Sequence, residues 1–94
     1  MKKQEFDSVW DAIEDSPAEA AGMKARADLM MAIREVVDGW TTTQSAAAKR
    51  LGITQPRLND LLRGRIDKFS IDALMSLAMN AGLSVRLQVI RPAA

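Results

Sequence analysis

The segment from Thr43 to Gly64 most restricts how this chain can fold, because its residues specify two short helices joined by a tight turn. A short, alanine-rich helix is expected over residues 44–51. Gly52 follows it and can adopt the positive φ that ends a helix. Thr54 can then cap a second helix that runs to about residue 63. The segment therefore predicts two crossed helices with a turn of a few residues between them.

The apolar residues of this segment are spaced to fill the angle between the two helices. Two small alanines allow the first helix to approach its neighbours closely, and four larger residues fill the space between the helices: Ala47, Ala48, Leu51, Ile53, Leu58 and Leu61. This packing leaves one set of polar residues and a proline exposed near the start of the second helix: Gln55, Pro56, Arg57, Asn59 and Asp60. The proline is tolerated because an N–H in the first turn of a helix has no partner within the helix, so none is lost.

Charge is strongly segregated along the chain, although the net charge is only +1. Residues 43–68 contain six cationic and two acidic residues, which gives +4, whereas residues 1–22 contain two cationic and six acidic residues, which gives −4. A solvated helix face would explain such a basic run. A local positive field that attracts a polyanion is the alternative.

The rest of the chain predicts two more helices around this pair. Ser16, Pro17 and Glu19 are typical of a helix start, and Gly39 can end this helix. An apolar stripe at spacings of three and four follows the start: Met23, Ala27, Met30, Ile33, Val37 and Trp40. Ser70 can cap a further helix that ends near Gly82. The methionines are expected to fill the core: Met23, Met30, Met31, Met75 and Met79. The expected fold class is all-α, with four main helices within residues 17–82.

The two ends of the chain differ from this helical domain. Residues 1–16 form an acidic segment in which Val9, Trp10 and Ile13 allow a short amphipathic helix. Residues 83–94 form a C-terminal strand and tail, in which residues 83–90 change to a period of two. This alternation predicts a strand with four apolar residues on one face: Leu83, Val85, Leu87 and Val89. Because a single strand needs a pairing partner, the same strand of a second copy is the simplest one. We therefore expect a homodimer.

Several classes of function are disfavoured by what the sequence lacks. Its 94 residues fit one domain, and the absence of Cys and His disfavours disulfides, thiolate or imidazole catalysis, metal sites and cofactors. The carboxylates of Asp11, Glu14 and Asp15 have no convergent base or nucleophile nearby in the sequence, so no enzyme is expected. No leader or long apolar stretch is apparent, which predicts a cytoplasmic protein without a membrane partner.

The chain resembles a known family, the XRE or lambda-repressor-like helix-turn-helix proteins. The similarity is carried by Thr43-Gln44, Ala48, Leu51-Gly52-Ile53, Leu58 and Arg63-Gly64. More narrowly it resembles HigA-type antitoxins of toxin–antitoxin operons, through the stretches 8–15, 24–26, 54–57 and 69–74. The resemblance implies a dimeric repressor of its own operon that binds double-stranded operator DNA. It also implies that the protein neutralises a small ribonuclease toxin of the RelE or HigB kind. Thr42 departs from the family pattern, which usually has an apolar residue there.

The resemblance and the chemistry together give candidate site residues. Base edges in the major groove would be read by the exposed start of the second helix: Gln55, Pro56, Arg57, Asn59 and Asp60. Phosphate contacts would come from hydroxyl, amide and cationic side chains around it: Thr43, Gln44, Thr54, Arg63, Arg65 and Lys68. Toxin binding would use Val9, Trp10 and Ile13, and dimerisation the strand at 83–89. Two alternatives remain open at this stage: a stand-alone regulator without a toxin, and a protein-interaction module that has lost DNA binding.

Overall fold

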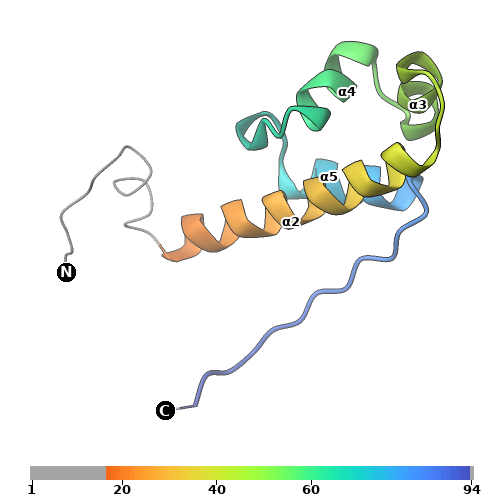
Figure 1. The fold of residues 1–94 in the computed structure, drawn as a ribbon. Helices are drawn as coiled ribbons and strands as arrows, with labels where there is room; N and C mark the ends of the chain where they lie inside the picture. The colour runs from red at the N-terminus through yellow and green to blue at the C-terminus, as the bar shows by residue number, and fades with distance from the viewer. Residues whose placement is uncertain (1–16, 94) are drawn as a thin grey trace.

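The computed structural model describes residues 17–93, and these residues are helical up to the start of an extended C-terminal segment. Figure 1 shows the arrangement: α2 and α5 lie side by side, α3 and α4 lie on one side of them, and the extended segment leaves from the opposite side. The elements are α2 (Pro17–Gly39), α3 (Gln44–Leu51), α4 (Gln55–Leu62), the 3₁₀ helix η1 (Ile66–Lys68) and α5 (Ile71–Asn80). The all-α prediction is confirmed for this part of the chain.

Helix α2 is the framework on which the other helices pack. It begins at Pro17 and ends at Gly39, as the sequence predicts. Three residues of its apolar stripe, Met30, Ile33 and Val37, are buried, and they contact α4, η1 and α5 through the shared core. The helix is therefore held mainly by one stripe along its C-terminal half, where the other elements cover it.

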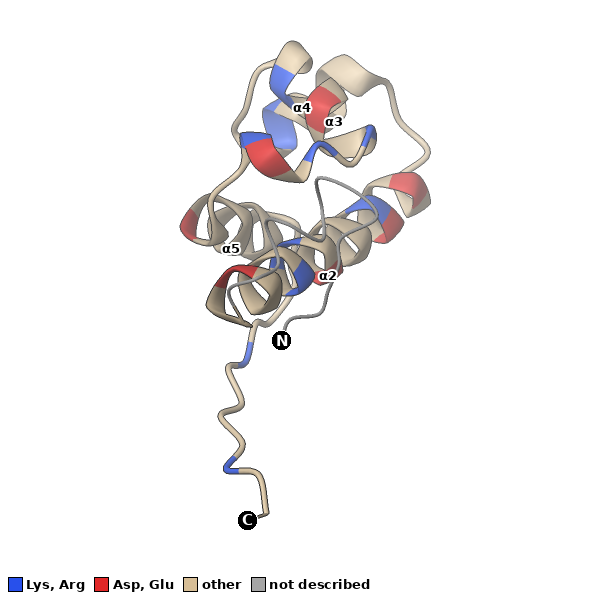
Figure 2. Ribbon diagram, turned by 90° about the vertical axis from the view of Figure 1, so that its left-hand side faces the viewer, with Lys and Arg blue, Asp and Glu red and all other residues tan. Residues whose placement is uncertain are grey.

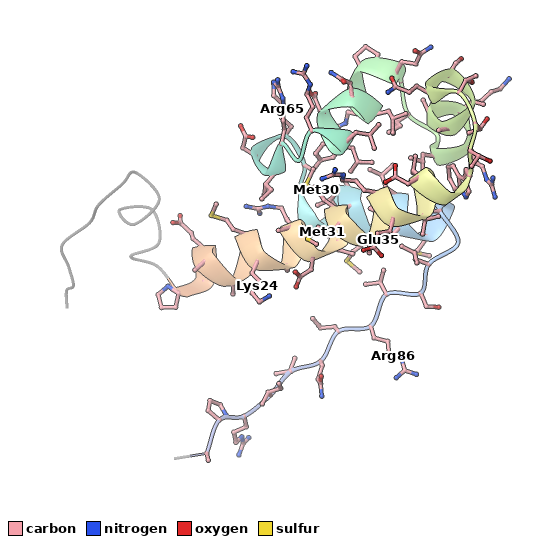
Figure 3. All side chains as sticks on the ribbon, in the orientation of Figure 1. Lys24, Met30, Met31, Glu35, Arg65 and Arg86 are labelled. Carbon is pink, nitrogen blue, oxygen red and sulfur yellow. The ribbon has the colours of Figure 1, made fainter. Side chains whose placement is uncertain are left out.

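The prediction that all five methionines fill the core is wrong. Met30 is 2% exposed, but its neighbour Met31 is 58% exposed on the outer face of α2 (Figure 3). On α5, Met75 and Met79 are 37% and 66% exposed. Successive residues of a helix differ by about 100° in direction, so Met30 and Met31 cannot both face the core.

Three hydroxyl side chains fix the starts of the shorter helices. The Oγ1 of Thr43 accepts from the backbone N–H of Ala46 over 3.1 Å, and the Oγ1 of Thr54 accepts from Arg57 over 3.3 Å. The Oγ of Ser70 does the same at the start of α5, over 3.1 Å. Each of these N–H groups lies in a first helical turn and would otherwise lack a partner. The caps at Thr54 and Ser70 were predicted from the sequence.

Gly52 ends α3 in the left-handed conformation, with a φ of 79°. Its N–H donates to the carbonyl of Lys49, and the next residue, Ile53, donates to Ala48. This is the tight turn that the sequence predicts between α3 and α4. A side chain here would strain the backbone because L-residues rarely adopt this φ.

The core lies where the four helices meet. Its largest fully buried side chains come from all of them, and each is 2% exposed or less: Met30, Ile33, Leu51, Leu58, Leu61 and Leu74. Replacing any one of the leucines by alanine would cost about 2–5 kcal/mol of stability. This single core sets the angle between α3 and α4.

The C-terminal segment, residues 83–93, is extended, and no strand is assigned among residues 17–93. Leu83 and Val85 are partly buried and pack against the helical core. Leu87 and Val89, which continue the same alternation, are 90% and 86% exposed. The predicted pairing of this segment with a second copy therefore stays a prediction. Of the four residues on its predicted apolar face, only Leu87 and Val89 are available to a partner.

No helix within residues 17–93 is long and apolar enough to cross a membrane.

Candidate nucleic-acid interface

The exposed edge of α4 consists of Gln55, Pro56 and Asn59, all of which are solvent-exposed. The opposite side of the same helix is fixed, because Leu58 and Leu61 are fully buried. Pro56 lies in the first turn of the helix, where it removes no hydrogen bond. The structure thus presents two amide side chains and a proline ring on a rigid helix, with their polar atoms free to meet a ligand.

Arg57 and Asp60 lie on the flank of α4 and both contact the segment that follows the helix. The Nη1 of Arg57 donates to the carbonyl oxygen of Lys68 over 2.7 Å. The Oδ1 of Asp60 lies 3.8 Å from the Nε of Arg65, an ion pair in which both side chains are partly exposed. Of the five residues predicted to read bases, the structure therefore places three on the open edge of α4 and joins the other two to residues 65–68.

The N-terminus of α3 forms a second part of the candidate site. Thr43 and Gln44 are both exposed, and the hydroxyl oxygen of Thr43 already accepts a hydrogen bond from Ala46. A helix N-terminus carries unpaired N–H groups and a partial positive charge, which favour a phosphate group. Thr54 is exposed at the start of α4 in the same way. All three residues are thus exposed at helix starts, and their role as phosphate contacts stays a prediction.

Exposed cations surround the two helices. Arg63, Arg65 and Lys68 are exposed on the segment that leaves α4, and Figure 2 shows lysine and arginine residues spread over the half of the molecule that contains α3 and α4. Arg65 projects from the η1 side of the molecule in Figure 3. Most of the positive charge that the sequence places in residues 43–68 is therefore on the surface of α3 and of the segment after α4.

Two further contacts near the site, beside those of Arg57, were not predicted from the sequence. The guanidinium of Arg50 lies 4.0 Å from the centre of the Trp40 ring, between α3 and the end of α2. The Nδ2 of Asn80, near the end of α5, donates to the carbonyl oxygen of Leu51 over 2.9 Å. The partners in the second contact are 29 positions apart, so no local pattern could have revealed it.

The remaining predicted residues lie elsewhere. Val9, Trp10 and Ile13 are outside the described residues, and the four residues predicted to form a dimer lie on the C-terminal segment, away from α4 (Figure 1). The part of the chain that is described contains no group of acidic residues arranged to hold a metal ion. The exposed edge of α4 and the cations of the segment after it are thus the candidate site that residues 17–93 offer.

This geometry, two short crossed helices with the second exposing its N-terminal edge among cations, defines a helix-turn-helix unit. Residues 12–90 match the family model described as a helix-turn-helix domain. A solved structure named as an XRE-family transcriptional regulator superimposes with a TM-score of 0.72 at 30% sequence identity, covering 79% of this chain and 83% of that chain. No curated protein matches the chain.

The chain belongs to the helix-turn-helix domain family, and it is an XRE-like member of it. The predicted resemblance to XRE proteins is confirmed. The narrower resemblance to HigA-type antitoxins stays a prediction.

Proposed function

We propose that this protein is a DNA-binding transcriptional repressor that inserts α4 into the major groove of an operator. The observation that carries the proposal is the exposed edge of α4, where Gln55, Pro56 and Asn59 project from a helix whose other side is fully buried. Recognition helices of this type present their N-terminal half to base edges. Gln55 and Asn59 carry side-chain amides, which pair with adenine through two hydrogen bonds.

Phosphate contacts would set the position of α4 in the groove. Thr43 and Gln44 at the start of α3 suit one DNA strand, and Arg63, Arg65 and Lys68 beyond α4 suit the other side of the groove. Each phosphate neutralised by a cation releases a counterion, so affinity falls as salt rises. The cluster of exposed cations supports a strong, salt-dependent component of binding.

The repressor would act as a homodimer. Leu87 and Val89 lie on one face of an extended segment and are almost fully exposed, which supports pairing with the same segment of a second copy. The matched family unit extends to residue 90 and therefore includes this segment. Two recognition helices about one turn of B-DNA (~34 Å) apart would then read a palindromic operator.

An antitoxin role is the more specific form of this proposal. It is supported by the sequence resemblance to HigA-type antitoxins, which implies a small ribonuclease toxin as a second partner and autoregulation of a shared operon. Val9, Trp10 and Ile13 remain the candidate anchors for that partner. Co-purification of a small basic protein encoded next to this gene would support the role, and a genome without such a neighbour would favour a stand-alone regulator.

The proposed DNA binding is tested by fluorescence anisotropy with the DNA upstream of the protein's own gene and with a scrambled duplex of equal length. The expected result is a Kd for the upstream DNA at least 10³-fold lower than for the scrambled duplex, with a clear loss of affinity as salt is raised. Equal affinity for both duplexes would contradict a sequence-specific repressor. No salt-dependent binding to either would favour a protein-interaction module.

A further inference from the structure

The guanidinium of Arg57 joins the start of α4 to the segment that follows the helix. Its Nη1 donates to the carbonyl oxygen of Lys68 over 2.7 Å, across 11 positions in the chain. Its Cζ lies 4.0 Å from the centre of the Phe69 ring. Phe69 is 3% exposed and belongs to the core, so the guanidinium is stacked on a surface that cannot move independently.

These two contacts need the chemistry of arginine. The guanidinium is planar, so the same group can lie flat on an aromatic ring while an N–H at its edge donates to a carbonyl. The 2.7 Å separation is typical of a hydrogen bond from a charged donor. A lysine in this place would keep the charge but could not make both contacts at once.

The residues that Arg57 holds are the ones that carry the cations. The chain from Arg63 to Lys68 is mostly exposed, and its packing onto the core depends on the partly buried Ile66. The start of this segment is also held by backbone hydrogen bonds to α4, the last of which runs from the N–H of Arg65 to the carbonyl of Asp60 over 3.1 Å. Among side-chain contacts, the ion pair between Asp60 and Arg65, at 3.8 Å, is a second link. Because that pair is partly exposed, it contributes little by itself, and Arg57 supplies the stronger side-chain link.

We infer that Arg57 is a positioning residue: it holds the cations of residues 65–68 at a fixed place relative to the exposed edge of α4, and it does not read a base. This inference rests on the proposed function and deepens it. Base reading is then assigned to Gln55, Pro56 and Asn59. Phosphate contact by Arg65 and Lys68 depends on a side chain that itself makes no DNA contact.

The inference is tested on a duplex enriched from a random pool by the unaltered protein, together with all its single-base variants. Arg57→Lys is expected to weaken binding about tenfold and by the same factor for every duplex, which leaves the base preferences unchanged. Asn59→Ala is the matched control on the exposed edge of α4. It is expected to reduce the differences in affinity among the four bases at one or two positions of the duplex. A loss of preference at one base pair in Arg57→Lys would overturn the inference.

The salt dependence of binding distinguishes a loss of cation positioning from a general loss of folded protein. Phe69→Leu removes no charge and changes a buried residue, yet it is expected to reduce the slope of log Kd against log salt by about one, as Arg57→Lys does, because the cations move off the phosphates. The double variant should bind no more than twofold more weakly than either single variant. An unchanged slope in both single variants, or fully additive losses, would contradict the inference.

A measurement without DNA keeps the test independent of folding losses. Amide hydrogen exchange in Arg57→Lys is expected to rise for residues 65–69 and to stay unchanged in α2 and α5. A rise in exchange of the same size in all helices, or no rise for residues 65–69, would overturn the inference. If instead the unaltered protein enriches no sequence from the pool, the proposed function itself fails, and the assignment of Arg57 fails with it.

Discussion

At the scale of single residues, the capping threonines define where the two helices of the DNA-binding unit begin. The Oγ1 of Thr54 accepts from the N–H of Arg57, at the start of the helix whose edge forms the candidate interface. Thr54→Ala is expected to lower the free energy of unfolding by about 1 kcal/mol, because that N–H loses its partner. Urea denaturation followed by circular dichroism measures this. Thr42→Ala, in the exposed linker, serves as the control and should change stability by less than about 0.5 kcal/mol.

Thr41 is the non-glycine residue with a positive φ, 47°, within residues 17–93. A β-branched residue is costly in this region, whereas asparagine tolerates it. Thr41→Asn is expected to raise the free energy of unfolding by up to about 1 kcal/mol. The same substitution at Thr42 is the matched control and should have no such effect. A gain of equal size at both positions would show that strain at Thr41 is not the cause.

At the scale of elements, the bounds of the helices could be predicted well because they depend on local chemistry. Thr43, Gly52, Thr54 and Ser70 each act on residues within one turn, and the structure has helix starts or ends at all of them. The exposed edge of α4 was predicted from the spacing of the apolar residues on the same helix. These features are encoded by residues close together in the sequence.

What could not be predicted depends on contacts between distant segments. Arg57 was assigned to base reading because it lies at the exposed start of the second helix, but its contact with Lys68 and Phe69 depends on where η1 folds back against α4. The exposure of Met31 is different, because it follows from the local rotation of about 100° between Met30 and Met31 on α2. Pairing of the C-terminal segment is still untested, since it requires a second copy.

The end of α3 is held by α5 through Asn80, whose side-chain amide donates to the carbonyl of Leu51 at 2.9 Å. Asn80→Asp keeps the size but removes the donor, and it is expected to cost about 1–3 kcal/mol because the carbonyl loses its partner and faces a carboxylate. Thermal unfolding measures this. Met79→Ala, at a side chain that is 66% exposed, is the control. If both variants unfold alike, Asn80 does not hold the two helices together.

At the scale of the whole molecule, the C-terminal segment leaves the helical domain on the side opposite α3 and α4 (Figure 1). Dimerisation through it would therefore leave both recognition helices free to meet DNA. The side chains of Leu87 and Val89 are 90% and 86% exposed, so their loss should not disturb the core. Substitutions at these two positions would therefore test dimerisation without disturbing the fold.

Leu87→Lys combined with Val89→Lys is expected to convert a dimer to a monomer, because charges on the paired face repel each other and are costly to bury. Sedimentation velocity measures the mass, and circular dichroism should show an unchanged fold. Ser84→Lys with Gln88→Lys adds the same charge to the other face and should remain dimeric. An unchanged mass in all these proteins would contradict dimerisation through this segment.

The central claim is that the exposed edge of α4 reads DNA sequence. It is tested most directly by comparing Gln55→Ala/Asn59→Ala with the unaltered protein on the upstream DNA and on a scrambled duplex, at one fixed salt concentration. The account predicts a loss of about 2–4 kcal/mol for the upstream DNA and almost no change for the scrambled duplex, because the phosphate contacts remain. An equal loss on both duplexes, or no loss on either, would contradict it.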